Sequence, residues 1–436
     1  MILTENTTVW LTTSNSRKIL LVSPQPFFAH RGTPINVKAM VSRLAEIGYE
    51  PHLLVLPHGE RIKIRGVHIH RCLSIPGIRN VPIGFSWQKL LYGFILFWHA
   101  LFLTLFVDYL VFQGVEEAAI IVGCLSMLRR KTYIVDIDSC MLEQLRRTSL
   151  RFIPGVLSAT RGLEKYFIRR ANAVVTVCQS LTDQVRKVST KVPIFQIEDF
   201  PVDGASGAEK ASIEKLRDEL SLHGKKVFLY TGNLESYQGI ELLLTAFSRM
   251  RRASVSVPSA LLIVGGEKRQ IEKYRSLSTR LGIEDSCIFA GVRPSTEMPK
   301  FLGLADALVS PRLSGENTPL KIYSYMASGK PIVATALSSH LQVLNSDSAI
   351  LSPASEEEFS RALAFAVEDS SDASMIRARM IENSLSLIST RYSKKQFDRR
   401  IYELYTFLLG PRAVLLTKVA QDKREEQESI ALAPER

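Results

Sequence analysis

The feature that most constrains the fold is a regular alternation of short apolar runs with helical segments. In the first half, the strand-like run Lys18–Ser23 precedes a loop with Pro and Gly, a helical pattern over 34–48 and a second run over 52–57. From residue 225 the order returns as strand KKVFLYTG, loop NLESYQ, helix GIELLLTAFSRM and strand SALLIVGG. Strands separated by helices predict βαβ units and parallel sheets. Two such series predict two doubly wound α/β domains, which bind ligands at the carboxyl ends of their strands.

A break in composition separates the two series. Residues 199–224 combine Pro, Gly and Ser with a short polar helical pattern, which is typical of a hinge. We predict a disordered leader over 1–16, a first Rossmann-like domain over 17–200, a linker over 201–224, a second Rossmann-like domain over 225–375, helices over 376–410 that pack back toward the first domain, and a flexible tail over 411–436.

Composition and missing motifs argue against several classes of protein. Of the 436 residues, 46% are hydrophobic and 22% charged, as in globular proteins. The five cysteines are scattered without a CxxC pair, so we expect a reducing compartment and neither a disulfide framework nor a zinc site. Neither first strand leads into G-x-G-x-x-G, and no Walker A sequence occurs, which disfavours dinucleotide dehydrogenases and P-loop motors. The leader lacks the pattern of a signal peptide, which favours a cytoplasmic protein.

The positive charge is concentrated in the first half. Residues 1–200 hold 24 basic and 14 acidic residues, whereas residues 201–436 hold 31 and 29. This excess points to an anionic partner, such as a phospholipid surface, a phosphorylated substrate or nucleic acid, and an ordinary basic surface is the alternative. The basic segment matches no nucleic-acid-binding module, so we expect no nucleic acid partner.

An uncharged apolar run over 90–107 leaves three interpretations open. It approaches the length that spans a bilayer, but His99 lies near its middle, and a span would divide the first sheet between two compartments. A second interpretation is a wholly buried core helix. We favour the third, a helix that packs on the sheet and touches the membrane interface, because the basic residues around it would attract anionic lipid.

The densest group of chemistry-bearing residues is SPRLSGENTPLKIYSYMASGKPIVAT, over Ser310–Thr335. A strand leads into a loop and then a helix, for which Pro319 suits the first position. Free N–H groups at a helix N-terminus suit a diphosphate, to which Arg312 and Lys321 add positive charge. Glu316 can accept hydrogen bonds from sugar hydroxyls. The alternative is an ordinary helix with a side-chain cap, either Asn317 or Thr318.

This segment resembles the signature of the family-4 (group 1) retaining glycosyltransferases. The resemblance runs from about Lys18 to Phe407, and FLYTGNLESYQGIELLLTAF, LLIVGG, IFAGV and ADALVSPRLSGENTPLKIYSYMASGKPIVAT carry it in the second domain. It implies the GT-B fold, in which two Rossmann-like domains face each other across a cleft. It also implies transfer from a nucleoside diphosphate sugar with retained anomeric configuration, and no requirement for a metal ion or other cofactor.

The resemblance assigns a donor site to the second domain. The first residue of the family's Glu-x7-Glu pair maps onto Glu316, which would contact the donor sugar, and the second position is Ser324, beside the ribose. Where many relatives clamp the diphosphate with Arg and Lys, this chain has Asn233 and Gln238. The expected donor-binding residues are Gly32, Gly232, Asn233, Gln238, Arg312, Asn317, Thr318, Pro319, Leu320, Lys321 and Ser324.

The first domain would supply the acceptor side. Its loop PQPFFAHRGTPINV resembles the family's Gly-rich loop, in which Gly32 lets the backbone approach a phosphate. Asp138 stands where many relatives carry a His near the reacting sugar. It could position a donor hydroxyl, receive the acceptor's proton or cap the next helix, and with Glu316 it is a candidate catalytic residue. The expected acceptor-side residues are Arg31, Asp136, Glu116 and Glu117.

These observations together predict a glycosyltransferase that acts on a hydroxyl acceptor in cell-surface polysaccharide or glycolipid assembly. The charge distribution favours a lipid-linked acceptor and a peripheral position on the inner face of the cytoplasmic membrane. Two alternatives remain. The loss of two cations is compatible with a non-catalytic nucleotide-sugar-binding protein, and the fold also accommodates sugar-nucleotide epimerases.

Overall fold

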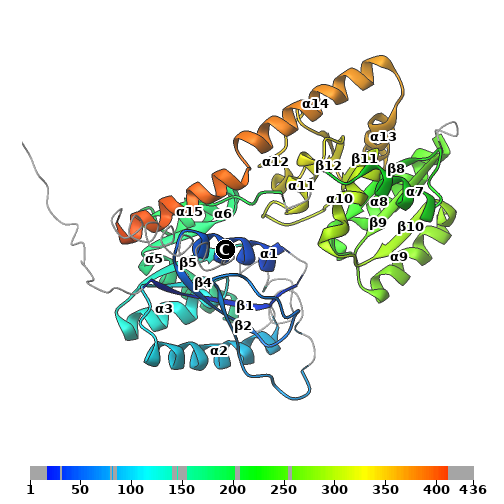
Figure 1. The fold of residues 1–436 in the computed structure, drawn as a ribbon. Helices are drawn as coiled ribbons and strands as arrows, with labels where there is room; N and C mark the ends of the chain where they lie inside the picture. Colours follow the sequence, from blue (N-terminus) through cyan, green and yellow to red (C-terminus); the bar gives the residue numbers. More distant parts are fainter. Residues whose placement is uncertain are drawn as a thin grey trace, which may run out of the picture.

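The computed structural model describes residues 17–29, 32–78, 81, 86–139, 145, 155–201, 207–253 and 258–410. They form two lobes, each built around one parallel sheet with helices on both faces (Figure 1). The leader over 1–16, the tail over 411–436 and Arg31 lie outside the described residues.

The first sheet has the strand order β3-β2-β1-β4-β5-β6-β7. The order reverses between β1 and β4, which places a topological switch point in the middle of the sheet. Its strands are β1 (Lys18–Pro26), β2 (Glu50–Leu56), β3 (His68–Arg71), β4 (Val111–Val115), β5 (Thr132–Ile137), β6 (Ala173–Thr176) and β7 (Ile194–Gln196).

Successive side chains along these buried strands point to opposite faces of the sheet, so they pack into two separate hydrophobic cores. Ile19 and Leu21 pack with α1 (Gly32–Glu46) and α15 (Lys394–Leu409) on one face. Leu20 and Val22 face the other helices. These are α2 (Trp87–Phe106), α3 (Ala118–Arg129), α5 (Val156–Arg170) and α6 (Gln179–Val188).

The second sheet repeats this plan with the order β10-β9-β8-β11-β12-β13. Its strands are β8 (Lys226–Thr231), β9 (Ser259–Val264), β10 (Cys287–Gly291), β11 (Ala307–Ser310), β12 (Ile332–Thr335) and β13 (Ile350–Ser352). One face packs against α8 (Ile240–Ala253), α9 (Lys268–Arg280) and α13 (Glu356–Val367), and the other against α7 (Lys210–Glu219), α10 (Met298–Leu304) and α11 (Lys321–Ala327). Three short 3-10 helices and a one-turn α-helix complete the lobe: η2 (Ser236–Gln238), η3 (Glu284–Ser286), η4 (Ser295–Glu297) and α12 (Ser338–Leu341).

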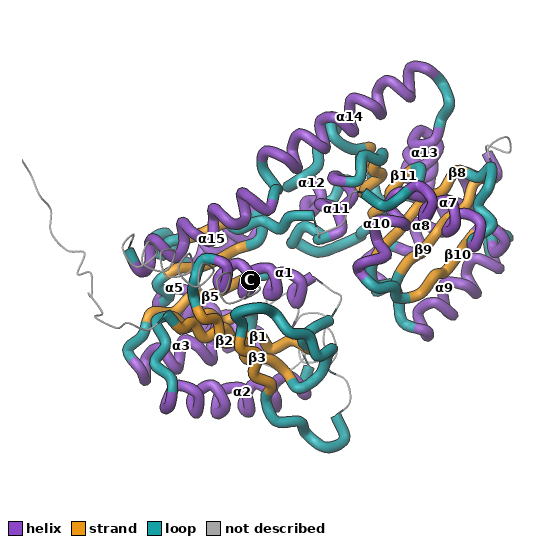
Figure 2. Tube along the Cα trace, viewed as in Figure 1, coloured by secondary structure: helices purple, strands orange, loops and turns teal. Residues whose placement is uncertain are grey.

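The predicted linker over 201–224 contains a helix of the second lobe. Ile213 and Leu216 of α7 pack on the core beside α10. At the other end, α14 (Ser371–Thr390) leaves the second lobe and α15 lies on the first, so the chain crosses back between the lobes (orange and red in Figure 1; helices in Figure 2). The Arg391 guanidinium follows α14 and pairs with Glu198 Oε1 at 2.9 Å.

Helix α2 is apolar on both of its faces. Tyr92, Leu96 and Ala100 are buried against the sheet, while Phe94 and Trp98 are 62% and 53% exposed. The interpretation of this segment as a wholly buried core helix is therefore wrong. By length and composition alone, α2 is the one described helix that could cross a membrane.

Candidate functional site

The loops after β8 and β11 meet at the carboxyl edge of the second sheet. The Leu313 N–H donates to the Tyr237 carbonyl at 2.8 Å. Gly239 has a φ of +73°, and a Cβ there would lie 1.9 Å from the Pro311 carbonyl oxygen. Only glycine permits this approach, so the two loops form one surface.

Arg312 organises the loop that carries Glu316. Its Nε donates to the Ser314 carbonyl at 2.7 Å, and its Nη1 and Nη2 donate to the Asn317 carbonyl and Oδ1 at 2.8 and 3.0 Å. Gly315, with a φ of +120°, makes room for the guanidinium, because a Cβ there would lie 2.0 Å from Nη2. Arg312 therefore holds its own loop in shape and also contributes a positive charge to it.

Lys321, the first residue of α11, places its ammonium beside the loop after β8. Its Nζ donates to Gln238 Oε1 at 3.3 Å, lies 3.8 Å from the centre of the Tyr230 ring and would lie 3.6 Å from a Cβ at Gly232. Burial, and then the charge of Arg312, hold the pKa of Lys321 well below its usual value. Among the described residues Lys321 has no ion pair, so its protonated form has no partner of opposite charge there.

The other expected donor-binding residues lie in the loop after β8, in the segment from β11 to α11 and at the start of α1. Asn233 accepts from the Tyr230 hydroxyl through its carbonyl at 2.6 Å, and the loop before α11 buries Thr318 and Pro319. Helix α11 begins at Lys321, two residues beyond Pro319. No side chain caps the helix, so the expectation of an Asn317 or Thr318 cap is wrong. Ser324 lies in its first turn, whereas Gly32 begins α1 in the first lobe, with open space where a Cβ would stand.

Glu316 lies between the lobes. Its carboxylate accepts from the Gln184 amide of α6, and its carbonyl accepts from Gln342 Nε2 at 2.8 Å. Gln342 Oε1 in turn accepts from the Ser180 N–H at the start of α6, at 2.8 Å. The Cys178 thiol is 3.8 Å from the Glu316 carbonyl oxygen. The side chain that the sequence marked as catalytic thus faces the first domain.

Buried acidic groups collect at the carboxyl edge of the first sheet. Asp136, at the end of β5, accepts from Gln113 Nε2 at 2.7 Å, and Gln113 Oε1 accepts from the Tyr405 hydroxyl of α15 at 2.8 Å. Asp138 Oδ1 accepts from Asn36 Nδ2 of α1 at 3.2 Å. Glu116, with a φ of +52°, accepts from Gln25 Nε2 at 2.7 Å.

Burial has the largest effect on the pKa values of these carboxyl groups. It raises the pKa of Asp136 and of Asp199 to about 7 each. Burial, and then the charge of Asp136, raise the pKa of Asp138 well above its ordinary value, and burial also raises the pKa of Glu116. Burial and the neighbouring carboxyl groups thus both favour the protonated form of Asp138, a form that can donate a hydrogen bond as well as accept one.

Two groups that the sequence did not single out connect the lobes. Asp199, just after β7, acts electrostatically on Asp138 and on Tyr323 of α11, so it lies near both halves of the site. Gln184 contacts Glu316 from 132 positions away in the chain. Of the expected acceptor-side residues, Glu117 pairs with Lys89 Nζ of α2 at 2.8 Å, and both charges act on the neighbouring Glu116 carboxyl group.

Comparisons with known proteins bear on this site. Residues 212–386 match the family model described as "Glycosyl transferases group 1". This range contains Glu316, Lys321 and the loop after β8, here called the Gly232 loop. The match agrees with the group 1 part of the resemblance that the sequence motifs indicated, over the lobe that carries the expected donor site.

Curated relatives match parts of the chain. The lipopolysaccharide 1,2-N-acetylglucosaminetransferase of Salmonella typhimurium is 27% identical over 211 residues, 44% of this chain and 51% of the relative. The alpha-D-kanosaminyltransferase of Streptomyces kanamyceticus is 22% identical over 56% of this chain and 62% of the relative. The alpha-monoglucosyldiacylglycerol synthase of Streptococcus pneumoniae is 25% identical over 45% of this chain and 42% of the relative. The chain thus spans about half the length of the curated relatives it matches.

Solved structures match almost the whole chain. Anabaena HepE in complex with UDP has a TM-score of 0.68 and 16% identity, covering 89% of this chain and 99% of HepE. WaaG, described as a glycosyltransferase involved in lipopolysaccharide biosynthesis, has a TM-score of 0.64 and 14% identity, covering 90% of this chain and 100% of WaaG. The predicted GT-B fold, two facing α/β domains, is confirmed.

Proposed function

We propose that the protein transfers a sugar from a nucleoside diphosphate sugar to a hydroxyl acceptor, with retention of anomeric configuration and without a metal ion. The observation that carries this proposal is the Lys321 ammonium, held beside the Gly232 loop without an ion pair among the described residues. A buried cation without a counter-charge is costly. A diphosphate placed there would supply the missing negative charge.

The same cation suits the chemistry of the leaving group. When the bond to the sugar breaks, negative charge builds on the diphosphate, and a fixed positive charge stabilises it without reorganisation. Lys321 provides this charge, and Arg312 adds to the positive potential while keeping its loop in shape. Gln238, in the position of a family cation, orients Lys321 instead of binding phosphate directly.

Glu316 and Asp138 hold the sugar from opposite lobes. In this structure the Glu316 carboxylate accepts from Gln184, and a donor sugar hydroxyl would take the place of that amide. Asp138 is held at the carboxyl edge of the first sheet, where Asn36 Nδ2 donates to its Oδ1 at 3.2 Å, so it is suited to orient a sugar hydroxyl placed there. Of the three roles that the sequence left open for Asp138, we favour positioning of a donor hydroxyl.

The comparisons guide the choice of substrates. HepE has been solved with UDP and with UDP-glucose, so UDP-sugars are the first donors to test. The name of the Salmonella relative contains lipopolysaccharide, and that of the pneumococcal relative contains monoglucosyldiacylglycerol, a glycolipid. We accordingly propose a lipid-linked glycan or glycolipid as the acceptor.

Nucleotide binding and turnover test this function together. We expect UDP or GDP, and the sugar nucleotide with the same base, to raise the thermal unfolding temperature by mass action. The preferred sugar nucleotide should be consumed with an extracted glycolipid fraction as acceptor. Affinity without consumption would favour a binding protein, and conversion of the sugar without acceptor would favour an epimerase. No affinity for any nucleotide would refute the proposal.

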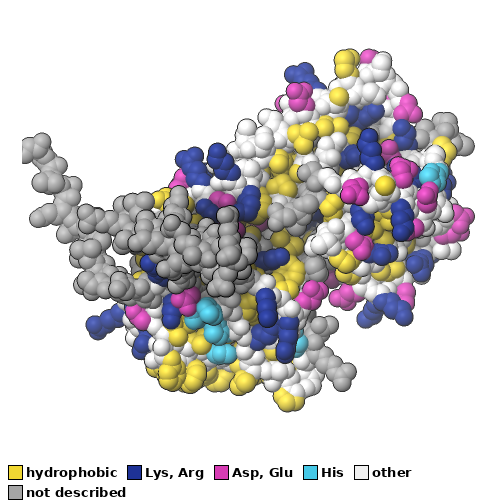
Figure 3. Space-filling view, viewed as in Figure 1, with side chains coloured by type: hydrophobic (Ala, Val, Ile, Leu, Met, Phe, Trp, Pro, Cys, Tyr) yellow, Lys and Arg dark blue, Asp and Glu magenta, His cyan; other side chains and the backbone are white. Residues whose placement is uncertain are grey.

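We also propose that the first domain rests on the inner face of the cytoplasmic membrane through the outer face of α2. Hydrophobic side chains gather over α2 in Figure 3. This outer face consists of Trp87, Leu90, Leu91, Phe94, Trp98, Phe102, Leu105 and Phe106, all exposed at helical spacing. The end of α3 lies alongside, because the Arg129 guanidinium donates to the Thr104 carbonyl at 2.7 Å. Apolar side chains beside exposed Arg129 and Arg130 suit an anionic bilayer surface.

The double substitution Phe94→Glu/Trp98→Glu tests this contact. We expect the wild type to sediment with vesicles that contain phosphatidylglycerol, and the variant to partition at least about tenfold less, because carboxylates are repelled by anionic headgroups and are costly to bury among acyl chains. The matched control is Met375→Glu, another exposed apolar position, on α14 of the returning segment. Equal sedimentation of all three proteins, or none, would contradict the membrane contact.

A further inference from the structure

Histidines gather at the edge of the first sheet opposite the candidate site. His52 lies near the start of β2, and His68 and His70 form part of the four-residue strand β3. The His52 ring centre is 4.7 Å from that of His68 and 5.1 Å from that of His70. These three make up a large share of the eight histidines in the chain. They lie at the amino ends of parallel strands, whereas Asp136 and Asp138 lie at the carboxyl ends.

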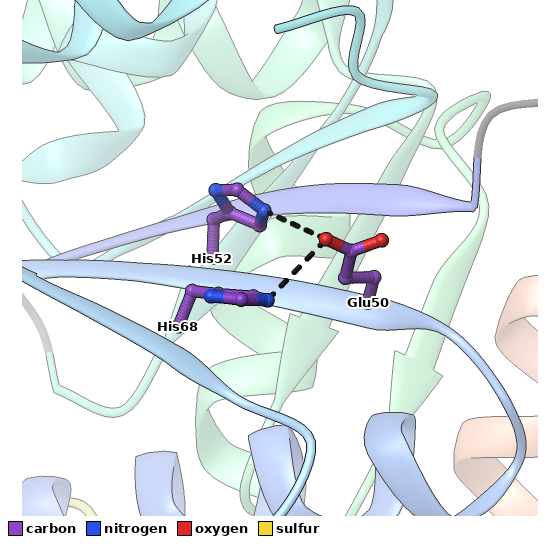
Figure 4. A group of neighbouring side chains, drawn as sticks. All are labelled: Glu50, His52 and His68. Atoms are coloured by element: carbon purple, nitrogen blue, oxygen red, sulfur yellow. Dashed lines mark ion pairs between the residues drawn. The ribbon is translucent and has the colours of Figure 1, made fainter.

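The strand register explains why these side chains converge. His52 and His68 are direct partners in the parallel pairing of β2 with β3. Glu50 stands two residues before His52, and residues two apart on a strand share a face. As a result, Glu50 Oε1 lies 3.5 Å from His52 Nε2 and 3.3 Å from His68 Nε2 (Figure 4).

A second layer of contacts orients the buried ring. The Nδ1 atom of His52 lies 3.0 Å from the Tyr109 hydroxyl and 3.1 Å from His70 Nε2. Its Nε2 atom is buried without a hydrogen bond of good geometry and points toward Glu50 and His68. With the proton on Nδ1, where Tyr109 or His70 accepts it, Nε2 presents a lone pair. This is how proteins commonly orient a metal-binding histidine.

We propose that Glu50, His52 and His68 bind a late first-row divalent cation, with Zn²⁺ as the best fit. Their three ligand atoms lie within 4.8 Å of one another. Zn²⁺ bonds of about 2.0–2.1 Å place tetrahedral ligand atoms about 3.3 Å apart, close to the two measured separations from Glu50. Two imidazoles and one carboxylate select zinc-like ions, whereas Mg²⁺ and Ca²⁺ require sets of oxygen ligands.

The ion would stabilise the pairing of the edge strand β3 with β2. It would join β3, a short edge strand, to β2 through side chains, in addition to the backbone ladder. His68 and Glu50 are partly exposed, at 57% and 41% of their side-chain areas, so water can complete the coordination. The scattered cysteines speak only against a zinc site with cysteine ligands, and this site contains no cysteine. The proposal is independent of sugar transfer, because the site lies away from Glu316 and Lys321.

Zinc binding by the full-length chain, without a polyhistidine tag and after treatment with a chelator, tests the proposal. Calorimetric titration with ZnCl₂ alone should show one ion bound per wild-type chain. The ion should also raise the thermal unfolding temperature. His68→Ala should weaken zinc binding by at least about tenfold, because even the loss of a group that only hydrogen-bonds to a metal ligand weakens metal binding by that much. Since the His68 side chain is more than half exposed, this variant should unfold like the wild type when no metal is added.

The matched control is His223→Ala, which removes an exposed histidine of the second lobe that pairs with Asp218. It should bind zinc as the wild type does. If the wild type binds no zinc, or if His68→Ala and His223→Ala bind it equally well, the three residues form only a hydrogen-bonded ion-pair cluster and the proposal is overturned. These readouts involve no sugar nucleotide, so they do not depend on the outcome of the transfer assay.

Discussion

The substitution Glu316→Gln is expected to lower kcat for sugar transfer by about 10²–10³-fold, the usual effect of losing one preorganised polar contact to a reacting group. The carboxylate lies in a loop fixed by Arg312 and Gly315, and it faces the first domain. Glutamine has the same shape but lacks the charge, so the loop should keep its conformation. Initial rates at saturating donor, with thermal unfolding of the same sample, separate lost catalysis from lost folding.

The control for this prediction is Glu272→Gln, at an exposed position on α9 of the same lobe. It should transfer sugar at the wild-type rate. Nucleotide affinity should change little in Glu316→Gln, because Lys321 carries the proposed diphosphate contact. If Glu316→Gln turns over as fast as Glu272→Gln, Glu316 has no role in the reaction.

The order of elements could be predicted from the sequence because it depends on local pattern. The expected helix GIELLLTAFSRM is α8 (Ile240–Ala253), and the expected strand SALLIVGG contains β9 (Ser259–Val264). Buried parallel strands are continuous apolar runs, and the helices between them carry one apolar stripe, so neighbouring residues suffice to recognise both. The same local information located Glu316 and Lys321, since strand, loop and helix start are contiguous in the chain.

Contacts between the lobes could not be predicted in this way. Gln184 reaches Glu316 only because α6 of the first domain faces the loop after β11. Asp199 has no motif around it, and its role depends on burial beside Asp136. The Glu50, His52 and His68 group depends on the pairing of β2 with β3, and a shift of one residue would send His68 to the other face. In each case the missing information is the register or orientation of distant segments.

The substitution Lys321→Met should weaken UDP binding by about 10–100-fold while it makes the free protein more stable. A hydrogen bond to a charged group contributes about 1.5–3 kcal/mol, which corresponds to that loss of affinity. Burial, and then the charge of Arg312, lower the pKa of Lys321, so holding its ammonium protonated in the folded chain costs stability in the absence of an anion. Removing it should therefore raise the free energy of unfolding by about 0.5–2 kcal/mol, as at other sites where function opposes stability.

The pH dependence supplies the sharper test, because the pKa of Lys321 in the free protein is lowered and a bound diphosphate would raise it. Wild-type UDP affinity should fall as pH rises through the lowered pKa, and binding near that pH should take up a proton, measurable by calorimetry in buffers of different ionisation enthalpy. The stability gain of Lys321→Met should be full at lower pH and vanish toward the pKa of an unfolded lysine, where both states hold a neutral amine. Lys300→Met, at an exposed position on α10, should show neither effect. If Lys321→Met binds UDP as the wild type does and is no more stable, the Lys321 ammonium is not the diphosphate contact, and the proposed function loses the observation that carries it.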